Sequence, residues 1–169
     1  PLQCALADAL GVPVISVEYR LAPEHPYPAA FDDCWAVLTH IHANPNIYGI
    51  DATRIAIAGD SAGGKLTAGL CLKARDLGTP RIAAQAIIYG NGGTVPNTES
   101  MMMFAEGYGL TAANSAKYLQ MLLPDNRYDD DPYAWPVRAK DHSGLPPTLV
   151  HMAELDVGRD SARHYAAKL

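Results

Sequence analysis

The chain has 169 residues, of which 49% are hydrophobic and 18% are charged. This composition is typical of a single globular domain that buries a core, and it excludes a disordered chain. The formal net charge is −5 and no cluster of Lys and Arg is present, so a nucleic-acid partner is disfavoured.

The sequence contains neither a signal peptide pattern nor an apolar run near the roughly 18 residues that cross a bilayer. We therefore expect no stable membrane insertion and a cytoplasmic protein. We expect all three cysteines, Cys4, Cys34 and Cys71, to be buried free thiols. Because residue 1 is a proline within a helical pattern, we expect the chain to be a fragment.

The first elements are a helix and a strand. Leu2, Leu6 and Leu10 recur at helical spacing and Gly11 ends the helix. The β-branched stretch 12–19 predicts a buried strand, and the prolines of 20–28 predict a loop. A second helix then begins at Pro28 and carries an apolar stripe up to a break at 44–51. The stripe consists of Phe31, Trp35, Leu38 and Ile41.

The centre of the chain contains a second short strand at 54–60, followed directly by a helix. This helix covers residues 61–77 and ends at Gly78 and Pro80. Leu66, Leu70 and Leu77 are expected on one of its faces.

The rest of the chain continues the alternation of strands and helices. A third strand is predicted at 81–90, a fourth at 147–153 and a final helix at 159–169. Between them, 91–141 is predicted to be a loop or cap-like insertion that contains a helix at 111–123.

Alternating strands and helices with short apolar strands predict an α/β fold. We expect about four parallel strands, with helices flanking both faces of the sheet. The whole chain, residues 1–169, is expected to form one domain, because no repeat or linker divides it.

The stretch GDSAG, residues 59–63, lies where a strand changes to a helix. A nucleophile elbow requires this context, because the sharp turn forces Ser61 outward. Side chains at Gly59 and Gly63 are expected to collide with neighbouring backbone. The helix N-terminus favours developing negative charge, with the backbone N–H of Ala62 as an oxyanion donor.

Two other interpretations of Ser61 remain open at this point. The serine can cap the helix at a glycine-rich turn, or the turn can hold a phosphate. Nucleotide binding is disfavoured, because Lys65 follows Gly64 but Leu66 stands where a magnesium-binding hydroxyl is needed.

GDSAGG (59–64) and YRLAPEHPYPAAFDD (19–33) resemble the hormone-sensitive-lipase-like family of α/β-hydrolase esterases. GLPPTLVHMAELDVGRD (144–160) is similar to the family's segment that carries the catalytic acid. The resemblance extends from Pro1 to Leu169 and implies a partial α/β-hydrolase fold. It implies hydrolysis of small-molecule carboxylic esters with short to medium acyl chains through an acyl-serine, without a cofactor or metal.

The catalytic acid is expected in the loop after the fourth strand, where Glu154, Asp156 and Asp160 compete. The family's Asp-Pro-Leu pattern maps its aspartate onto Asp156, although Val157 and Gly158 replace the Pro and Leu. We expect Asp160 to cap the final helix and Glu154 to make a structural contact.

None of the six histidines is expected to be the base. His164 alone follows Asp156. It lies only about two helical turns after Asp156, within the final helix, so it is not expected to bridge Asp156 and Ser61. The others are expected to be structural or surface residues, and no metal pair is expected: His25, His40, His42, His142 and His151.

The resemblance places the catalytic histidine beyond Leu169 and the other oxyanion donors in a His-Gly-Gly-Gly loop before Pro1. It equates the four predicted strands with strands four to seven of an eight-stranded sheet, in which strand three lies between strands four and five. We therefore expect a gap in the sheet and a chain that does not fold stably alone.

Three further segments have structural interpretations. Arg20 and Glu24 are expected to pair or to bond to backbone and to brace the elbow. Residues 129–131 are expected to be solvated loop rather than a calcium site. The methionine-rich stretch 100–109 fits either core or a lid over an acyl pocket.

Two alternatives to ester hydrolysis remain. The scaffold can serve a ligand-binding receptor, which the intact Ser61 and Asp156 oppose, or an amide or formamide hydrolase with the same constellation. The sequence does not predict an oligomeric state.

Overall fold

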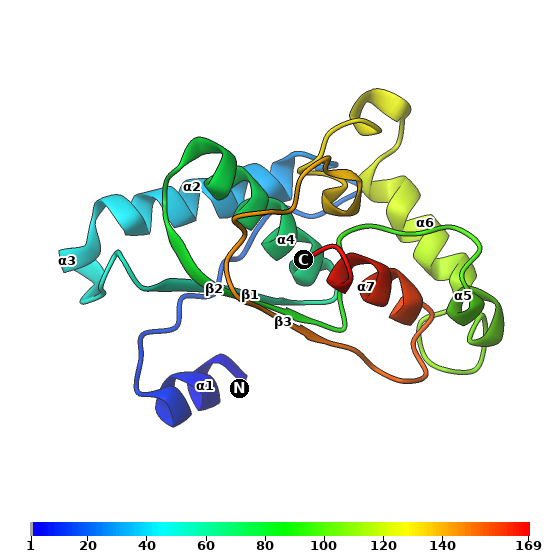
Figure 1. Ribbon diagram of the computed structural model, residues 1–169, viewed down its shortest axis with the longest axis horizontal. Coiled ribbons are helices and arrows are strands. Elements are labelled where there is room, and N and C mark those ends of the chain that lie inside the picture. Colours follow the sequence, from blue (N-terminus) through cyan, green and yellow to red (C-terminus); the bar gives the residue numbers. More distant parts are fainter. Residues whose placement is uncertain (1) are drawn as a thin grey trace.

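The computed structural model describes residues 2–169, whose helices and strands alternate along most of the chain (Figure 1). The elements in chain order are α1 (Leu2–Leu10), α2 (Ala29–Ala43), α3 (Pro45–Tyr48), β1 (Ile55–Asp60), α4 (Ala62–Leu77), β2 (Ile82–Ile88), α5 (Glu99–Met103), α6 (Ala112–Leu122), the 3₁₀ turns η1 (Asn126–Tyr128) and η2 (Pro136–Arg138), β3 (Thr148–His151) and α7 (Arg159–Ala166).

The three strands form one parallel sheet in the order β1-β2-β3. Gly59 of β1 pairs with Ile87 of β2, which in turn pairs with Val150 of β3. Each strand is joined to the next by a segment that contains helix, as parallel strands require. The predicted α/β fold with a parallel sheet is confirmed.

The predicted strand at 12–19 is wrong. Within residues 2–169 this segment pairs with no strand, and Val12, Val14 and Ile15 are exposed. β-Branched residues favour a half-buried, pleated surface. They form a strand only where a neighbouring strand supplies the backbone hydrogen bonds. The described sheet therefore has three strands instead of four, and 12–19, which was expected across a gap from β1, pairs with none of them.

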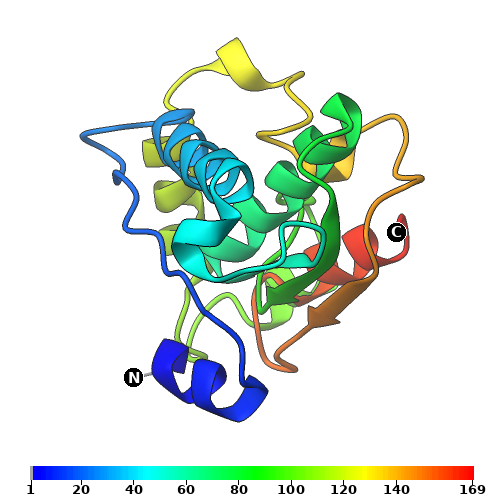
Figure 2. The same ribbon diagram turned by 90° about the vertical axis from the view of Figure 1, so that its left-hand side faces the viewer.

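Helices cover one face of this sheet. Ile87 of β2 packs against Ala68 of α4 and Tyr165 of α7, and α2 packs in turn on α4 (Figure 2). The opposite face remains open: Leu149 of β3 is 62% exposed, and α1 lies on this side, apart from the strands (Figure 1). The predicted flanking helices are confirmed for the covered face only.

The core joins α2, α4 and the 91–141 insertion. Phe31 of α2 is 2% exposed, and its ring stacks on that of Tyr133 with centroids 6.0 Å apart. Leu70 of α4 belongs to the same cluster, together with Trp135. Of the predicted apolar stripe on α2, Phe31, Leu38 and Ile41 are buried and Trp35 is half-buried, whereas Leu77 at the end of α4 is 58% exposed.

Two predicted side-chain environments are corrected. Cys34 and Cys71 are buried free thiols, but Cys4 is exposed on α1, because no other helix or strand of the described residues packs closely on α1. Arg20 pairs with Asp33 of α2 at 2.7 Å and does not pair with Glu24. The Arg20 Nε also donates to the other Asp33 oxygen, so the guanidinium and the carboxylate form a two-bond, bidentate pair. This pair fixes the 20–28 loop on α2.

The 91–141 segment contains two capped helices. Thr98 precedes α5 and its hydroxyl accepts the Met101 N–H, while Thr111 caps α6 in the same way through Asn114. The predicted helix at 111–123 is therefore confirmed. No helix within residues 2–169 has the length and apolar character needed to cross a membrane.

Candidate functional site

Ser61 is the single residue between β1 and α4, and its backbone is strained. Its φ of 50° and ψ of −115° lie in a region that residues with a side chain rarely adopt. Two backbone bonds hold it: the Ser61 N–H donates to the Ile88 carbonyl at 2.9 Å, and the Gly64 N–H donates to the Ser61 carbonyl at 3.0 Å. The strand-to-helix turn is therefore as sharp as the sequence predicts.

The Ser61 side chain is exposed and does not cap α4. No hydrogen bond joins its hydroxyl to the amides of the first turn. The helix-cap interpretation is therefore wrong in this structure.

The Lys65 side chain lies in the first turns of α4. Its ammonium lies 4.4 Å from the centre of the Trp135 ring, and burial lowers the pKa of Lys65 to about 8. Lys65 thus contacts an indole on the insertion and is not part of a phosphate loop.

The glycines around the elbow differ in whether a larger residue would fit at their positions. A Cβ at Gly59 would collide with the Gly63 carbonyl, as predicted. A Cβ at Gly63 would have no neighbour within 4 Å, so the predicted collision at Gly63 is wrong. Sequence reasoning missed Gly90, where a Cβ would lie 2.7 Å from the Ser61 carbonyl oxygen and 2.9 Å from Gly64 Cα.

Gly90 has a recognisable signal in hindsight. It follows β2, the strand beside β1, and it begins the glycine-rich stretch GNGG. Parallel neighbours end at the same edge of a sheet, so the turn after β2 must pass close to the elbow. Only a residue without a side chain allows that approach.

Ala62 is the first residue of α4 and is exposed beside Ser61. The first amides of an α-helix have no partner within the helix, and its positive dipole end lies at the same point. The Ala62 N–H is therefore in the position expected of an oxyanion donor.

Asp156 lies in the loop between β3 and α7 and is half-buried. Its Oδ1 accepts the Gly158 N–H at 2.6 Å, and Oδ2 has no partner within residues 2–169. A small cavity is lined by both Asp156 and Gly90, which packs on Ser61. The structure therefore brings Asp156 to the edge of the sheet at which Ser61 lies.

The two competing carboxylates have other partners. Asp160 does not cap α7, because Gly158 occupies the N-cap position and Asp160 lies within the first turn. Its Oδ2 instead accepts the Ser100 N–H at 2.8 Å, and its Oδ1 pairs with Arg159 at 2.9 Å. Glu154 contributes its backbone carbonyl, which accepts a bond from Arg159, while its side chain is exposed.

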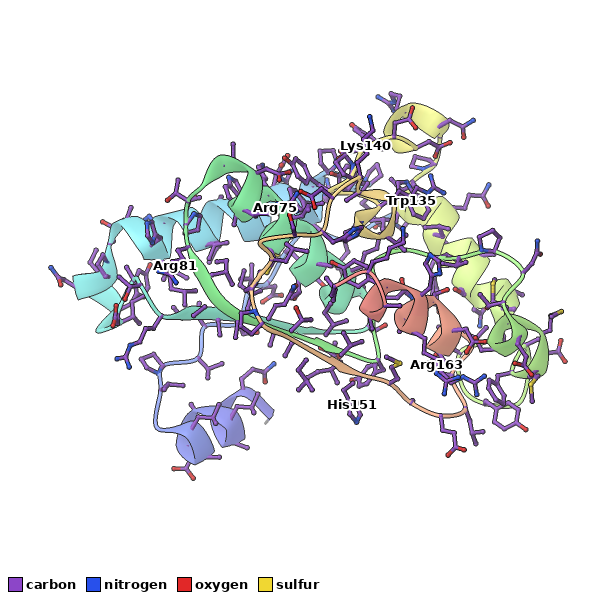
Figure 3. The ribbon with its side chains drawn as sticks, in the orientation of Figure 1. Arg75, Arg81, Trp135, Lys140, His151 and Arg163 are labelled. Carbon is purple, nitrogen blue, oxygen red and sulfur yellow. The ribbon has the colours of Figure 1, made fainter. Side chains whose placement is uncertain are left out.

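No histidine within residues 2–169 is hydrogen-bonded to Ser61 or Asp156. His142 Nε2 lies 2.9 Å from the Pro136 carbonyl oxygen, and its ring packs edge-on against Tyr165. His151 lies at the end of β3 and points away from α4 and α7 (Figure 3). His164 is exposed on α7. The described site therefore holds a serine and a carboxylate without an imidazole between them.

The described residues contain no group of three His, Cys, Asp or Glu side chains placed to hold a metal ion. In the 129–131 stretch, Asp129 and Asp130 are exposed, but Asp131 is not simply solvated. Its two oxygens accept bonds from the Tyr27 hydroxyl and the Tyr133 N–H, both at 2.8 Å. Asp131 thus ties the insertion to the loop just before α2.

Comparison with known proteins gives consistent results. A family model described as alpha/beta hydrolase fold matches residues 2–169. The carboxylic ester hydrolase LipN of Mycobacterium tuberculosis is 39% identical, over 99% of this chain and 46% of LipN. A Pyrobaculum calidifontis esterase structure is 39% identical with a TM-score of 0.88, over 96% of this chain and 53% of that one. The crystal structure of DphMB1 is 37% identical with a TM-score of 0.94, over 99% and 56%.

The chain spans about half the length of the curated relatives it matches, from 46% of LipN to 54% of an arylesterase from Saccharolobus solfataricus.

Proposed function

Because this chain belongs to the alpha/beta hydrolase fold family, we propose that the full-length protein hydrolyses carboxylic esters through an acyl intermediate on Ser61. The observation that carries the proposal is the strained, exposed Ser61 at the junction of β1 and α4, whose hydroxyl has no hydrogen-bond partner within residues 2–169. Relatives named as ester hydrolases support the reaction class.

The proposed reaction follows from the placement of the groups. A histidine from outside this chain takes the Ser61 proton as Oγ attacks the ester carbonyl, then returns it to the leaving alcohol. Water releases the acyl group by the same steps in reverse order. The Ala62 N–H, at the N-terminus of α4, stabilises the oxyanion that forms in both halves.

Asp156 is proposed to orient that histidine. The Gly158 N–H occupies Oδ1, which leaves Oδ2 free to accept the imidazole N–H. A carboxylate held in this way fixes the ring orientation and stabilises the imidazolium that forms during attack. Asp160 is committed to Ser100 and Arg159, and Glu154 has an exposed side chain that no hydrogen bond within residues 2–169 holds in one orientation.

The substrate is proposed to be a small ester with a short to medium acyl chain, and residues 91–141 are proposed to form a cap-like insertion beside the site. Within it, α5 presents Met102 and Met103, which are 69% and 57% exposed. Flexible, polarisable methionines adapt to apolar ligands of varied shape. Phe104 is buried beneath Tyr108 and Arg159, so its role is structural.

The test is ester hydrolysis by the full-length protein, with acetyl, butyryl, octanoyl and lauroyl esters of p-nitrophenol. We expect Ser61→Ala to lower kcat by about 10³-fold or more, because the acyl intermediate needs that oxygen. The corresponding anilides, included in the same assay, separate an esterase from an amide hydrolase. Hydrolysis of no ester by the unaltered protein, or an unchanged rate in Ser61→Ala, would contradict the proposal.

A further inference from the structure

Residues 95–100 of the insertion are hydrogen-bonded to the loop and first turn that follow Asp156. The Ser100 N–H donates to Asp160 Oδ2 at 2.8 Å, and the Asp160 N–H donates to Ser100 Oγ at 3.1 Å. The Ser100 hydroxyl donates to the Val157 carbonyl at 3.0 Å. The Val95 N–H donates to Ser161 Oγ at 3.0 Å. We call the reciprocal pair and its bond to Val157 the Ser100–Asp160 clasp.

The clasp is sheltered from water and has charged support. Ser100 is completely buried, and α5 lies beside α7 (Figures 1 and 3). Arg159 Nε and Arg163 Nη1 lie 2.9 and 3.3 Å from Asp160 Oδ1, and the bond from Arg159, followed by that from Ser100, lowers the pKa of Asp160. Asp160 is thus an ionised acceptor, which makes the bond from Ser100 charge-assisted and stronger than a neutral one.

A single peptide plane connects the clasp to Asp156. The carbonyl of the Val157–Gly158 peptide accepts the Ser100 hydroxyl, and the N–H of that same peptide donates to Asp156 Oδ1. Because a peptide unit is rigid and planar, its orientation at the carbonyl end sets its orientation at the N–H end. Gly158 contributes no Cβ to restrict this plane, and a Cβ there would lie only 3.2 Å from Asp156 Oδ1.

We propose that Ser100 is a positioning residue for Asp156: its hydroxyl fixes the Val157–Gly158 peptide plane, and that plane orients the carboxylate. Asp160 acts one step further out, by holding Ser100. This inference rests on the proposed function, in which Asp156 orients the catalytic base. It gives the 95–100 segment a part in the reaction, in addition to its place in the insertion.

A purely structural role makes a different prediction. Ser100 Oγ also accepts an amide of the first turn of α7, so its loss removes a helix cap and lowers stability whatever its effect on Asp156. A cap alone changes how much protein is folded, whereas a positioning role changes kcat of each folded, titrated active site. The relevant readout is therefore kcat per active site, measured together with KM.

The experiment uses the full-length protein and compares Ser100→Ala with Thr111→Ala. Thr111 is a matched control, since its hydroxyl caps α6 and bonds to neither α7 nor the Asp156 loop. Active sites are counted with a fluorophosphonate, and kcat and KM are measured for a butyryl ester. We expect Ser100→Ala to lower kcat by about 10- to 100-fold with little change in KM, as a small misplacement of a catalytic group does. Thr111→Ala should change neither.

A second pair of variants keeps the proposal testable if Ser100→Ala does not fold. Asp160→Asn retains an oxygen that accepts the Ser100 N–H, whereas Asp160→Ala removes it. We expect kcat of the Asn variant to stay near that of the unaltered protein and kcat of the Ala variant to fall. Unchanged kcat in Ser100→Ala, or equal losses in the two Asp160 variants, would overturn the clasp. If the unaltered protein neither hydrolyses esters nor reacts with the fluorophosphonate, the proposed function has failed instead.

Discussion

Ser61 adopts an unfavourable backbone conformation that its neighbours hold in place. A non-glycine residue in such a region costs on the order of 1–3 kcal/mol, and it persists only where surrounding structure over-determines it. Here, the Ile88 carbonyl and the Gly64 N–H bond the two sides of the residue, and Gly90 allows the turn after β2 to approach. The strain keeps the hydroxyl out of a capping position and available to a substrate.

The two glycines of the GDSAG stretch are predicted to respond differently to alanine. Gly59→Ala places a Cβ against the Gly63 carbonyl, so the elbow must distort, and the melting temperature and ester hydrolysis should both fall. Gly63→Ala meets open space on a helix, where alanine is favoured over glycine by roughly 0.5–1 kcal/mol, so its melting temperature should hold or rise. Thermal unfolding of both variants checks this contrast. Equal losses would show that the elbow geometry described here is wrong.

Asp156→Asn in the full-length protein is predicted to reduce kcat by about 10⁴-fold, because an amide cannot hold the imidazole in the required tautomer. Glu154→Gln is the matched control: it neutralises a carboxylate two residues away whose side chain is exposed, and its kcat should not change. Steady-state rates on one ester are sufficient. A larger loss in Glu154→Gln than in Asp156→Asn would reassign the acid.

At the scale of elements, the spacing of apolar residues and the helix stop signals in the sequence predicted most of the helices and strands. The stripe on α2 and the glycine that ends α4 both have local causes, and both are found where predicted. The stretch 12–19 shows the limit of such a prediction, since a strand depends on a neighbouring strand that the local composition does not reveal. Asp160 shows the same limit: its position resembles a helix cap, but its partner, Ser100, is distant in sequence.

The exposed methionines of α5 allow a test of the proposed lid. If Met102 contacts the acyl chain, Met102→Ala removes apolar contact that long chains use more than short ones, and the ratio of octanoyl to acetyl hydrolysis should fall. Leu77→Ala is the control, because Leu77 is similarly exposed but lies at the far end of α4 from Ser61. An unchanged ratio in Met102→Ala would remove Met102 from the acyl site.

At the scale of the whole molecule, the parallel sheet explains why residues distant in sequence form one site. Ser61 follows β1, Gly90 follows β2 and Asp156 follows β3, so all three lie at the carboxyl edge of the sheet. The positions of Ser61 and Asp156 at this edge were predictable, because the motif and the order of strands place them there. The Ser100–Asp160 clasp was not, since its bonds join residues that are distant in sequence, and the glycine signal at Gly90 has meaning only once β2 is known to lie beside β1.

The open face of the sheet is the other feature of the whole molecule. Leu149 on that face is exposed, α1 lies apart from it, and the chain spans about half the length of its curated relatives. That this chain does not fold stably alone stays a prediction. The kinetic experiments above therefore use the full-length protein.

The most direct test of the central claim is covalent labelling of the full-length protein with a fluorophosphonate, followed by mass spectrometry of its peptides. Such a reagent phosphonylates a serine only where the oxygen is activated and an oxyanion site receives the new charge. We predict one stoichiometric adduct on the peptide that contains Ser61, and none in the Ser61→Ala variant. An unlabelled protein, or an adduct on another serine that persists in Ser61→Ala, would contradict the account.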